Sequence, residues 1–226
     1  MNYHIDSGLI INSFKSKCAC PICEIKKDLE EKLTYEFLND AVMDDDCRIS
    51  VGKKGFCAHH YDMLFNRQNK LSLALQMDTF NSVTLSKLLR QPKSLKDAKN
   101  IAKEIESATN SCVICDVLDV LIKKYCQTVF RLFVENPDFY KLIYNSNGFC
   151  MKHYAMLISE CKNMGAFTKE YLKVLSTCQN NAVNNINQNV KTFTLKHDYR
   201  NSLNPLGSSE DALIDEREKL FGKIYK

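Results

Sequence analysis

Eight residues of the chain, six cysteines and two histidines, have the types and spacings of metal ligands. C-x-x-C pairs stand at 20–23 (CPIC) and 112–115 (CVIC), and G-F-C-x-x-H phrases begin at Gly55 and Gly148. Three thiolates and one imidazole complete a tetrahedral structural zinc site. The C-x-x-H spacing places two ligands one helical turn apart, near a helix N-terminus whose dipole favours thiolate. The pattern therefore predicts metal binding.

The same motifs occur twice at nearly one interval. The C-x-x-C pairs are offset by 92 residues (112 − 20) and the G-F-C phrases by 93 (148 − 55). A fixed period of this kind predicts an internal duplication, over roughly residues 18–108 and 110–195. We expect a first metal-binding helical repeat with a linker at 1–108. A second repeat with a C-terminal tail follows at 109–226.

The eight ligands can close two sites in two ways. Local closure keeps each site within one repeat, whereas exchange brings Cys20 and Cys23 to Cys150 and His153. Exchange costs only about 1 kcal/mol more in loop closure, for spans of about 130 against about 40 residues. Each repeat has a polar return segment before its G-F-C phrase, so we predict local closure. The predicted sets are Cys20, Cys23, Cys57 and His60 in the first repeat and Cys112, Cys115, Cys150 and His153 in the second.

Comparison of the repeats separates ligands from neighbours. His60 matches His153, whereas His59 stands opposite Lys152, so His60 is the expected ligand and His59 a surface residue. Cys18 has no counterpart and stays open as an alternative ligand or reactive thiol. The remaining unmatched cysteines are expected to be small buried hydrophobes. They are Cys47, Cys126, Cys161 and Cys178.

The pattern between the motifs is helical. The chain holds only 7 glycines and 4 prolines, and apolar residues recur at 3.6-residue spacing after each C-x-x-C pair. We expect a short helix at each G-F-C phrase, a helical linker after Pro92 and one long helix from about residue 167. A terminal helix should be capped by Ser208 or Ser209. The expected fold is all-α, with two tandem related helical subdomains, each organised around a Cys3His metal site.

Composition narrows the class of protein. The chain is 45% hydrophobic and 26% charged, and no stretch is long and apolar enough for a membrane span. The first residues carry no basic segment of a signal peptide. We therefore expect a cytoplasmic protein, where eleven cysteines favour metal binding over disulfides. The net charge of +4 is small and the basic residues are dispersed along the chain, so we do not expect nucleic acid as a partner.

A closed four-ligand site leaves zinc no open position for substrate or water. No catalytic residue is assigned, because the sequence contains no phosphate loop, nucleophile elbow or H-E-x-x-H helix. An iron–sulfur cluster with the same ligands stays open as an alternative. A dithiol redox pair is disfavoured, because the βαβ context of such pairs is missing.

At these residues the chain resembles an uncharacterised bacterial family. CPIC, GFCAHHY, CVIC, GFCMKHY and the tail DYRNSLNP carry the resemblance, which covers nearly the whole chain. CVIC departs from CPIC by lacking proline. The resemblance implies a bacterial, metal-binding helical protein, and it implies no substrate.

The main functional prediction is a non-enzymatic protein that binds two zinc ions per chain. It would serve as a binding or adaptor module for an unidentified protein partner. One alternative is a redox or metal-handling protein that uses an iron–sulfur cluster or reactive thiolates. Another is a nucleic-acid-binding zinc protein, and an enzyme of unrecognised type is the residual alternative.

Overall fold

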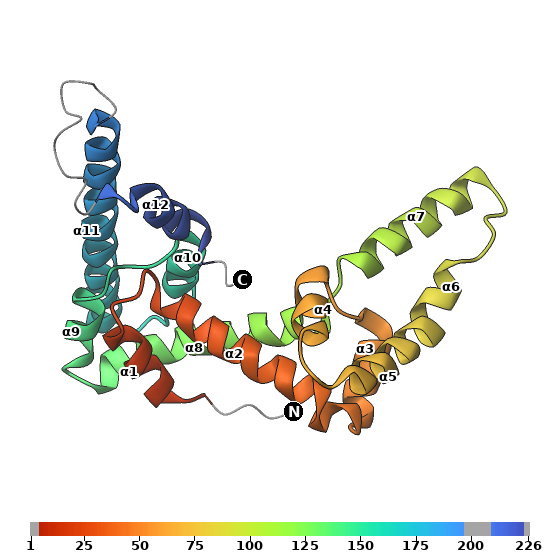
Figure 1. Cartoon of the computed structure of the whole chain (residues 1–226). Coiled ribbons are helices and arrows are strands. Elements are labelled where there is room, and N and C mark those ends of the chain that lie inside the picture. The colour runs from red at the N-terminus through yellow and green to blue at the C-terminus, as the bar shows by residue number, and fades with distance from the viewer. Residues whose placement is uncertain (1–4, 197–208, 224–226) are drawn as a thin grey trace. The chain divides into compact units, whose positions relative to one another are not determined.

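The computed structural model describes residues 5–196 and 209–223, and these ranges form helices and loops without a β-strand (Figure 1). The all-α fold class is therefore confirmed. None of the described helices has the length and hydropathy needed to cross a membrane. The common origin of the two halves stays a prediction.

The chain divides into two compact units. The terminal unit contains residues 1–27 and 121–226, and the central unit contains residues 28–120. Helices α2 (Pro21–Leu38) and α8 (Val113–Glu135) each contribute residues to both units. The compact units therefore do not coincide with segments 1–108 and 109–226. They group the two chain ends together and leave the middle of the chain as the other unit.

Aromatic side chains form much of the terminal unit's core. The ring of Phe14 lies 5.3 Å from that of Phe139 and 5.9 Å from that of Phe149, between centroids. Tyr171 is fully buried and packs edge-on to Phe130 at 5.0 Å. Besides the ends of α2 and α8, this unit contains α1 (Ser7–Lys15), α9 (Phe139–Tyr144), α10 (Met151–Ser159), α11 (Ala166–Lys196) and α12 (Ala212–Phe221).

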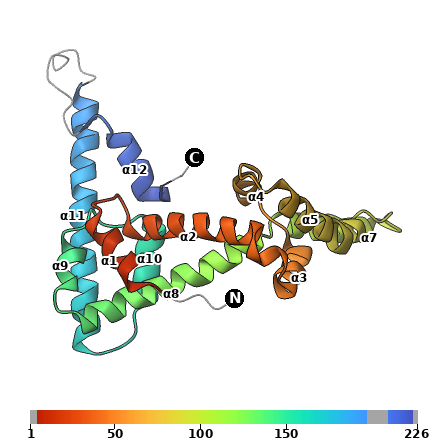
Figure 2. The same cartoon turned by 60° about the horizontal axis from the view of Figure 1, so that its bottom comes forward.

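The last two helices lie side by side in the terminal unit, as both views show (Figures 1 and 2). Helix α11 is continuous over 31 residues, which confirms the predicted long helix. The tail DYRNSLNP lies outside the described residues, as does Ser208. The predicted serine cap of α12 is wrong for Ser209. A turn at Glu210 and Asp211 delays the helix start, so that Asp211 takes the N-cap position.

The central unit is built around α3 and α5, which pack against each other. Side-chain amides tie α5 to the end of α2: Asn69 Nδ2 donates to the carbonyl of Leu38 at 2.8 Å, and Gln76 Nε2 donates to that of Phe37. Its elements are η1 (Asp40–Val42), α3 (Asp45–Lys54), α4 (Ala58–Phe65), α5 (Lys70–Phe80), η2 (Asn81–Leu85), α6 (Ser86–Leu88) and α7 (Leu95–Thr109).

The predicted linker after Pro92 is helix α7, and it belongs to the central unit. Ser94 caps it by accepting a hydrogen bond from the amide of Asp97 at 3.1 Å. Ile101 buries its side chain, and α7 contacts α6. The segment is therefore a packed element, which brings the chain back to the start of α8.

Candidate metal centres

Both G-F-C phrases adopt the same local structure. Gly55 and Gly148 have φ of +61° and +77°, a conformation that L side chains rarely adopt. The cysteine two residues later takes the N-cap position, Cys57 for α4 and Cys150 for α10. The following helical turn brings the histidine to the same side as the cysteine. The predicted helix starts are thus confirmed.

The C-x-x-C pairs lie at the first turns of α2 and α8. The carbonyl of Cys20 accepts hydrogen bonds from the amides of Cys23, at 3.0 Å, and Glu24. Cys112 precedes the first residue of α8 in the same way, and its carbonyl accepts from Asp116 at 3.2 Å. Each pair therefore sits at a helix N-terminus, where the dipole favours thiolate.

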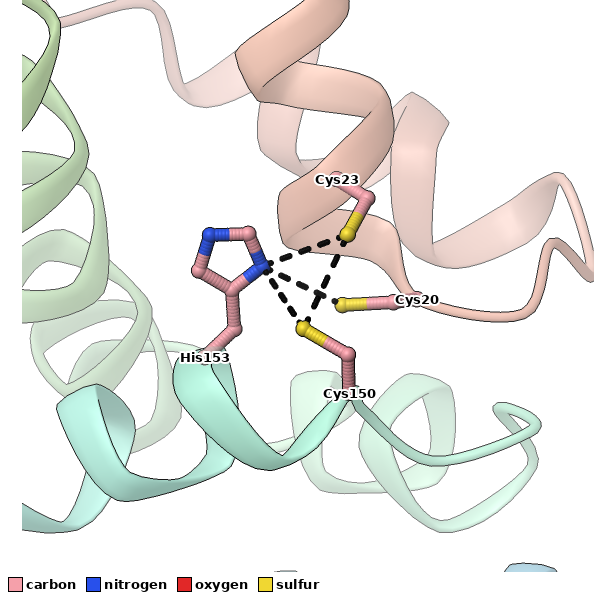
Figure 3. A group of neighbouring side chains, drawn as sticks. All are labelled: Cys20, Cys23, Cys150 and His153. Carbon is pink, nitrogen blue, oxygen red and sulfur yellow. Dashed lines mark hydrogen bonds between the residues drawn. The ribbon is translucent and has the colours of Figure 1, made fainter. Parts of the chain in front are cut away.

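One group of four donors, the outer cluster, lies in the terminal unit (Figure 3). Nδ1 of His153 lies 3.6 Å from Sγ of Cys20, 3.4 Å from that of Cys23 and 3.3 Å from that of Cys150. The sulfurs of Cys23 and Cys150 are 3.8 Å apart. All four side chains are buried, so the donors face one another away from solvent.

The second group, the inner cluster, lies in the central unit and repeats this geometry. Nδ1 of His60 is 3.3 Å from the sulfurs of Cys57, Cys112 and Cys115. The sulfurs of Cys57 and Cys115 are 3.8 Å apart. His60 and Cys112 are buried, whereas Cys57 and Cys115 are half-buried. The two clusters thus have the same types of donor, three cysteines and one histidine, and differ in how far these side chains are exposed to solvent.

The prediction of local closure is wrong, because the predicted ligands group across the two halves of the chain. Cys20 and Cys23 meet Cys150 and His153, and the G-F-C phrase at Gly55 meets the pair at 112–115. Helix α2 has 18 residues and is about 27 Å long, so it carries the chain far from Cys20 before the first G-F-C phrase. The extra loop-closure free energy of about 1 kcal/mol is small beside the free energy gained by packing within each unit.

In each cluster the four donor atoms lie within 4.8 Å of one another, so one ion could contact all of them. A disulfide needs sulfurs about 2.05 Å apart, and all eleven cysteines are free. The donor set and spacing therefore fit a metal ion in both places.

The comparison with protein families gives one result. A family model spans residues 1–226, the whole chain. The chain belongs to DUF6062, a family of unknown function. No curated protein and no solved structure matches the chain. Membership of an uncharacterised family confirms the resemblance seen in the sequence, while the bacterial origin stays a prediction.

The pKa values of the inner-cluster side chains of this DUF6062 protein are shifted in different directions. Burial opposes ionisation of Cys112, but its hydrogen bond with His60 lowers the pKa of this thiol to about 6. Burial alone would lower the pKa of His60, but the hydrogen bond with Cys112 and the nearby carboxylate of Glu30 raise it to about 10.

The outer cluster follows the same principle with different partners. Hydrogen bonds from Cys20 and Cys23 lower the pKa of Cys150, while the bond to Cys150 raises the pKa of Cys23 to about 12. Each cluster thus favours one thiolate and keeps protons on other thiols. An incoming metal must displace those protons, so metal affinity falls as pH falls.

A buried carboxylate stands beside the inner cluster. Oε1 of Glu30 lies 3.5 Å from Nε2 of His60 and 3.7 Å from Nε2 of His59. His59 is exposed, as the repeat comparison predicted, and His60 faces the cysteines. A carboxylate at the second ring nitrogen orients a ligating histidine and raises its basicity. Glu30 is not among the predicted site residues, although it stands seven residues after Cys23 on the same helical face.

Helix α12 reaches the outer cluster. Nζ of Lys219 donates to the carbonyls of Ala19, at 2.9 Å, and Asn147, at 2.6 Å, and only 5% of this residue is exposed. A Cβ on Gly222, whose φ is +85°, would lie 3.3 Å from Sγ of Cys23 and 3.6 Å from that of Cys150. Neither Lys219 nor Gly222 is among the predicted site residues.

The other cysteines lie outside the clusters. Cys126 and Cys178 are buried as predicted, but the prediction is wrong for Cys47 and Cys161, which are half-buried. They sit near helix ends, where packing is incomplete. Cys18 is half-buried as well, and its thiol donates to the carbonyl of Ser13 at 3.7 Å. Cys18 is therefore not a member of the outer cluster.

Proposed function

We propose that this chain holds two structural zinc ions, one in the outer cluster and one in the inner cluster. The donor distances carry the proposal. Zinc bonds of about 2.3 Å to sulfur and about 2.05 Å to nitrogen, in a tetrahedron, separate two sulfurs by about 3.8 Å and sulfur from nitrogen by about 3.6 Å. The clusters show 3.8 Å between sulfurs and 3.3 to 3.6 Å between sulfur and nitrogen.

The same distances favour one ion over an iron–sulfur cluster. Such a cluster spaces its protein ligands around several iron atoms, so those ligands lie farther apart than the ligands of one ion. Four protein ligands also fill the coordination sphere of zinc. The bound ion would therefore hold together segments that are distant in the sequence, and the zinc-binding free energy would be folding free energy.

Metal analysis of the full-length protein, purified without oxygen, tests this proposal. We expect about two equivalents of zinc in a colourless protein. Brown protein with visible absorbance would point to iron–sulfur clusters instead. A metal content near zero, with all cysteines freely titratable, would contradict the proposal.

We further propose that the protein acts as a binding module. Exposed leucines of the central unit support this role: Leu71, Leu89 and Leu95 are each more than 70% exposed. Leu89 and Leu95 flank the connection between α6 and α7, and exposed apolar side chains that lie near each other favour protein binding. In-cell crosslinking should recover a protein partner with the wild type and lose it when the three leucines are changed to lysine, at unchanged zinc content. Retention of the same partner would contradict the assignment of these leucines to partner binding.

A second candidate function is metal handling or redox response at the inner cluster. Its support is the half-buried state of Cys57 and Cys115, which gives reagents access to two sulfurs of this cluster. Treatment with a hydroperoxide should then release one of the two zinc ions and oxidise these cysteines. Retention of both ions through oxidation and reduction cycles would favour the purely structural function.

A further inference from the structure

The two clusters hold their ligand loops together by different means. Each needs its C-x-x-C segment to stay beside its G-F-C segment. In the inner cluster, Ser111 Oγ donates to the carbonyl of Lys54 at 2.6 Å, and the amide of Val113 donates to that of Gly55 at 3.1 Å. Two hydrogen bonds to backbone carbonyls therefore join the loops of the inner cluster.

The outer cluster lacks the groups that make these bonds. Ala19 stands before the first cysteine where the inner cluster has Ser111, so it offers no hydroxyl. Pro21 follows that cysteine where the inner cluster has Val113, and proline has no amide hydrogen. The chemistry of these two residues excludes both bonds.

One direct hydrogen bond joins the two loops farther from the C-x-x-C pair, where Asn147 Nδ2 donates to the carbonyl of Lys17 at 2.6 Å. Next to Cys20, Lys219 makes the connection. Its ammonium donates to the carbonyl of Ala19, before the C-x-x-C pair, and to that of Asn147, before the G-F-C phrase. These two carbonyls flank the outer cluster from its two separate loops. Lys219 lies on α12, a third segment of the chain. Its side chain reaches from this helix to both loops.

The rest of α12 continues the contact. The Lys223 ammonium lies 3.4 Å from Oε1 of Glu24, the residue after Cys23. Gly222 lets the backbone approach two ligand sulfurs. Three thiolates and one zinc ion carry a net charge of −1, and the buried ammonium of Lys219 supplies an opposite charge close by.

We propose that Lys219 is a positioning residue of the outer cluster, through which metal binding there and docking of α12 stabilise each other. This inference rests on the proposed zinc sites. It makes the C-terminal helix part of one metal centre and leaves the inner cluster independent of it. Linkage requires that loosening α12 weakens metal binding, and that metal removal loosens α12.

The test uses the full-length zinc protein and the substitution Lys219→Met, which keeps the aliphatic stem and removes the donors. Lys152→Met is the matched control, because it removes a positive charge from an exposed position within the G-F-C phrase of the same cluster. Chelator titration with alkylation and mass mapping of each cysteine reports on the two clusters separately. Hydrogen exchange of residues 212–221 reports on α12.

We expect Lys219→Met to lower zinc affinity of the outer cluster by about 10- to 100-fold, the usual cost of removing a supporting contact. Hydrogen exchange in α12 should become faster, while the zinc affinity of the inner cluster should stay at the wild-type value. Lys152→Met should match the wild type in zinc affinity and in hydrogen exchange. Adding Ala19→Ser and Pro21→Val to Lys219→Met should restore affinity, because these changes supply the donors found in the inner cluster.

Equal behaviour of Lys219→Met and Lys152→Met in both measurements would overturn the inference. If Lys219→Met is insoluble, a soluble triple variant with two zinc ions supports the inference, and an insoluble triple variant overturns it. A wild type without metal would instead contradict the proposed function.

Discussion

Paired substitutions can establish which residues share a metal ion. Cys20→Ser with Cys150→Ser removes two ligands from the outer cluster and none from the inner cluster. Cys20→Ser with Cys57→Ser removes one ligand from each. Local closure would reverse these two assignments, so the two double variants separate the arrangements directly.

The size of the effect follows from the number of ligands. The binding free energy of a structural zinc site is about 10 to 16 kcal/mol, so an equal share for each of four ligands is about 2.5 to 4 kcal/mol. One lost ligand then weakens zinc binding by about two to three powers of ten. A chelator of intermediate strength will empty any cluster with a missing ligand and leave an intact cluster filled.

Under such a chelator, we expect Cys20→Ser with Cys150→Ser to retain one equivalent of zinc and Cys20→Ser with Cys57→Ser to retain none. Cys47→Ser serves as the control and should retain two, because Cys47 belongs to neither cluster. The assay is elemental analysis after gel filtration. The opposite result for the two double variants would refute the exchanged arrangement, and two retained equivalents in both would refute metal ligation by these residues.

Three other predictions concern single positions. Gly55→Ala should destabilise the protein by about 1 to 3 kcal/mol more than Gly165→Ala in thermal unfolding. Both glycines have φ of +61°, but only a Cβ at Gly55 would meet a neighbour, a ring carbon 2.9 Å away; equal losses would show that this contact is irrelevant. Glu30→Gln should weaken zinc binding at the inner cluster by about 10- to 100-fold in chelator competition, whereas the exposed Glu31→Gln should not. Equal affinities of those two variants would exclude a supporting role for the carboxylate. Iodoacetamide should modify Cys57 before the buried outer-cluster cysteines in time-resolved mass mapping, and simultaneous modification would contradict the difference in exposure.

Local features of the clusters could be predicted from the sequence because short-range geometry determines them. The G-F-C phrase needs a glycine at positive φ, and the helix that follows it places His60 beside Cys57. The grouping of the ligands could not be predicted in this way. It depends on how far α2 and α8 carry the chain and on which segments pack together, and the difference in loop-closure free energy was too small to decide it.

The supporting residues were missed for a related reason. Glu30 and Lys219 gain their roles only from segments that are distant in the sequence, so no local motif contains them. Each carried a weak signal, since both are charged residues on an apolar helical face. Lys219 stands seven residues after the buried Ala212, and Glu30 stands seven after Cys23. A charge at such a position needs a partner once it is buried.

The exchanged ligands also set an order of events during synthesis on the ribosome. Cys23 is made 127 residues before Cys150, an interval of about 6 to 25 s at about 5 to 20 residues per second. Between the synthesis of His60 and that of Cys115, the only complete set of the predicted ligands on the nascent chain is Cys20, Cys23, Cys57 and His60, which is not a native cluster. A zinc ion captured early would therefore have to change ligands as the second half emerges. With the proposed zinc sites, correct assembly would depend on when zinc arrives as well as on which residues bind it.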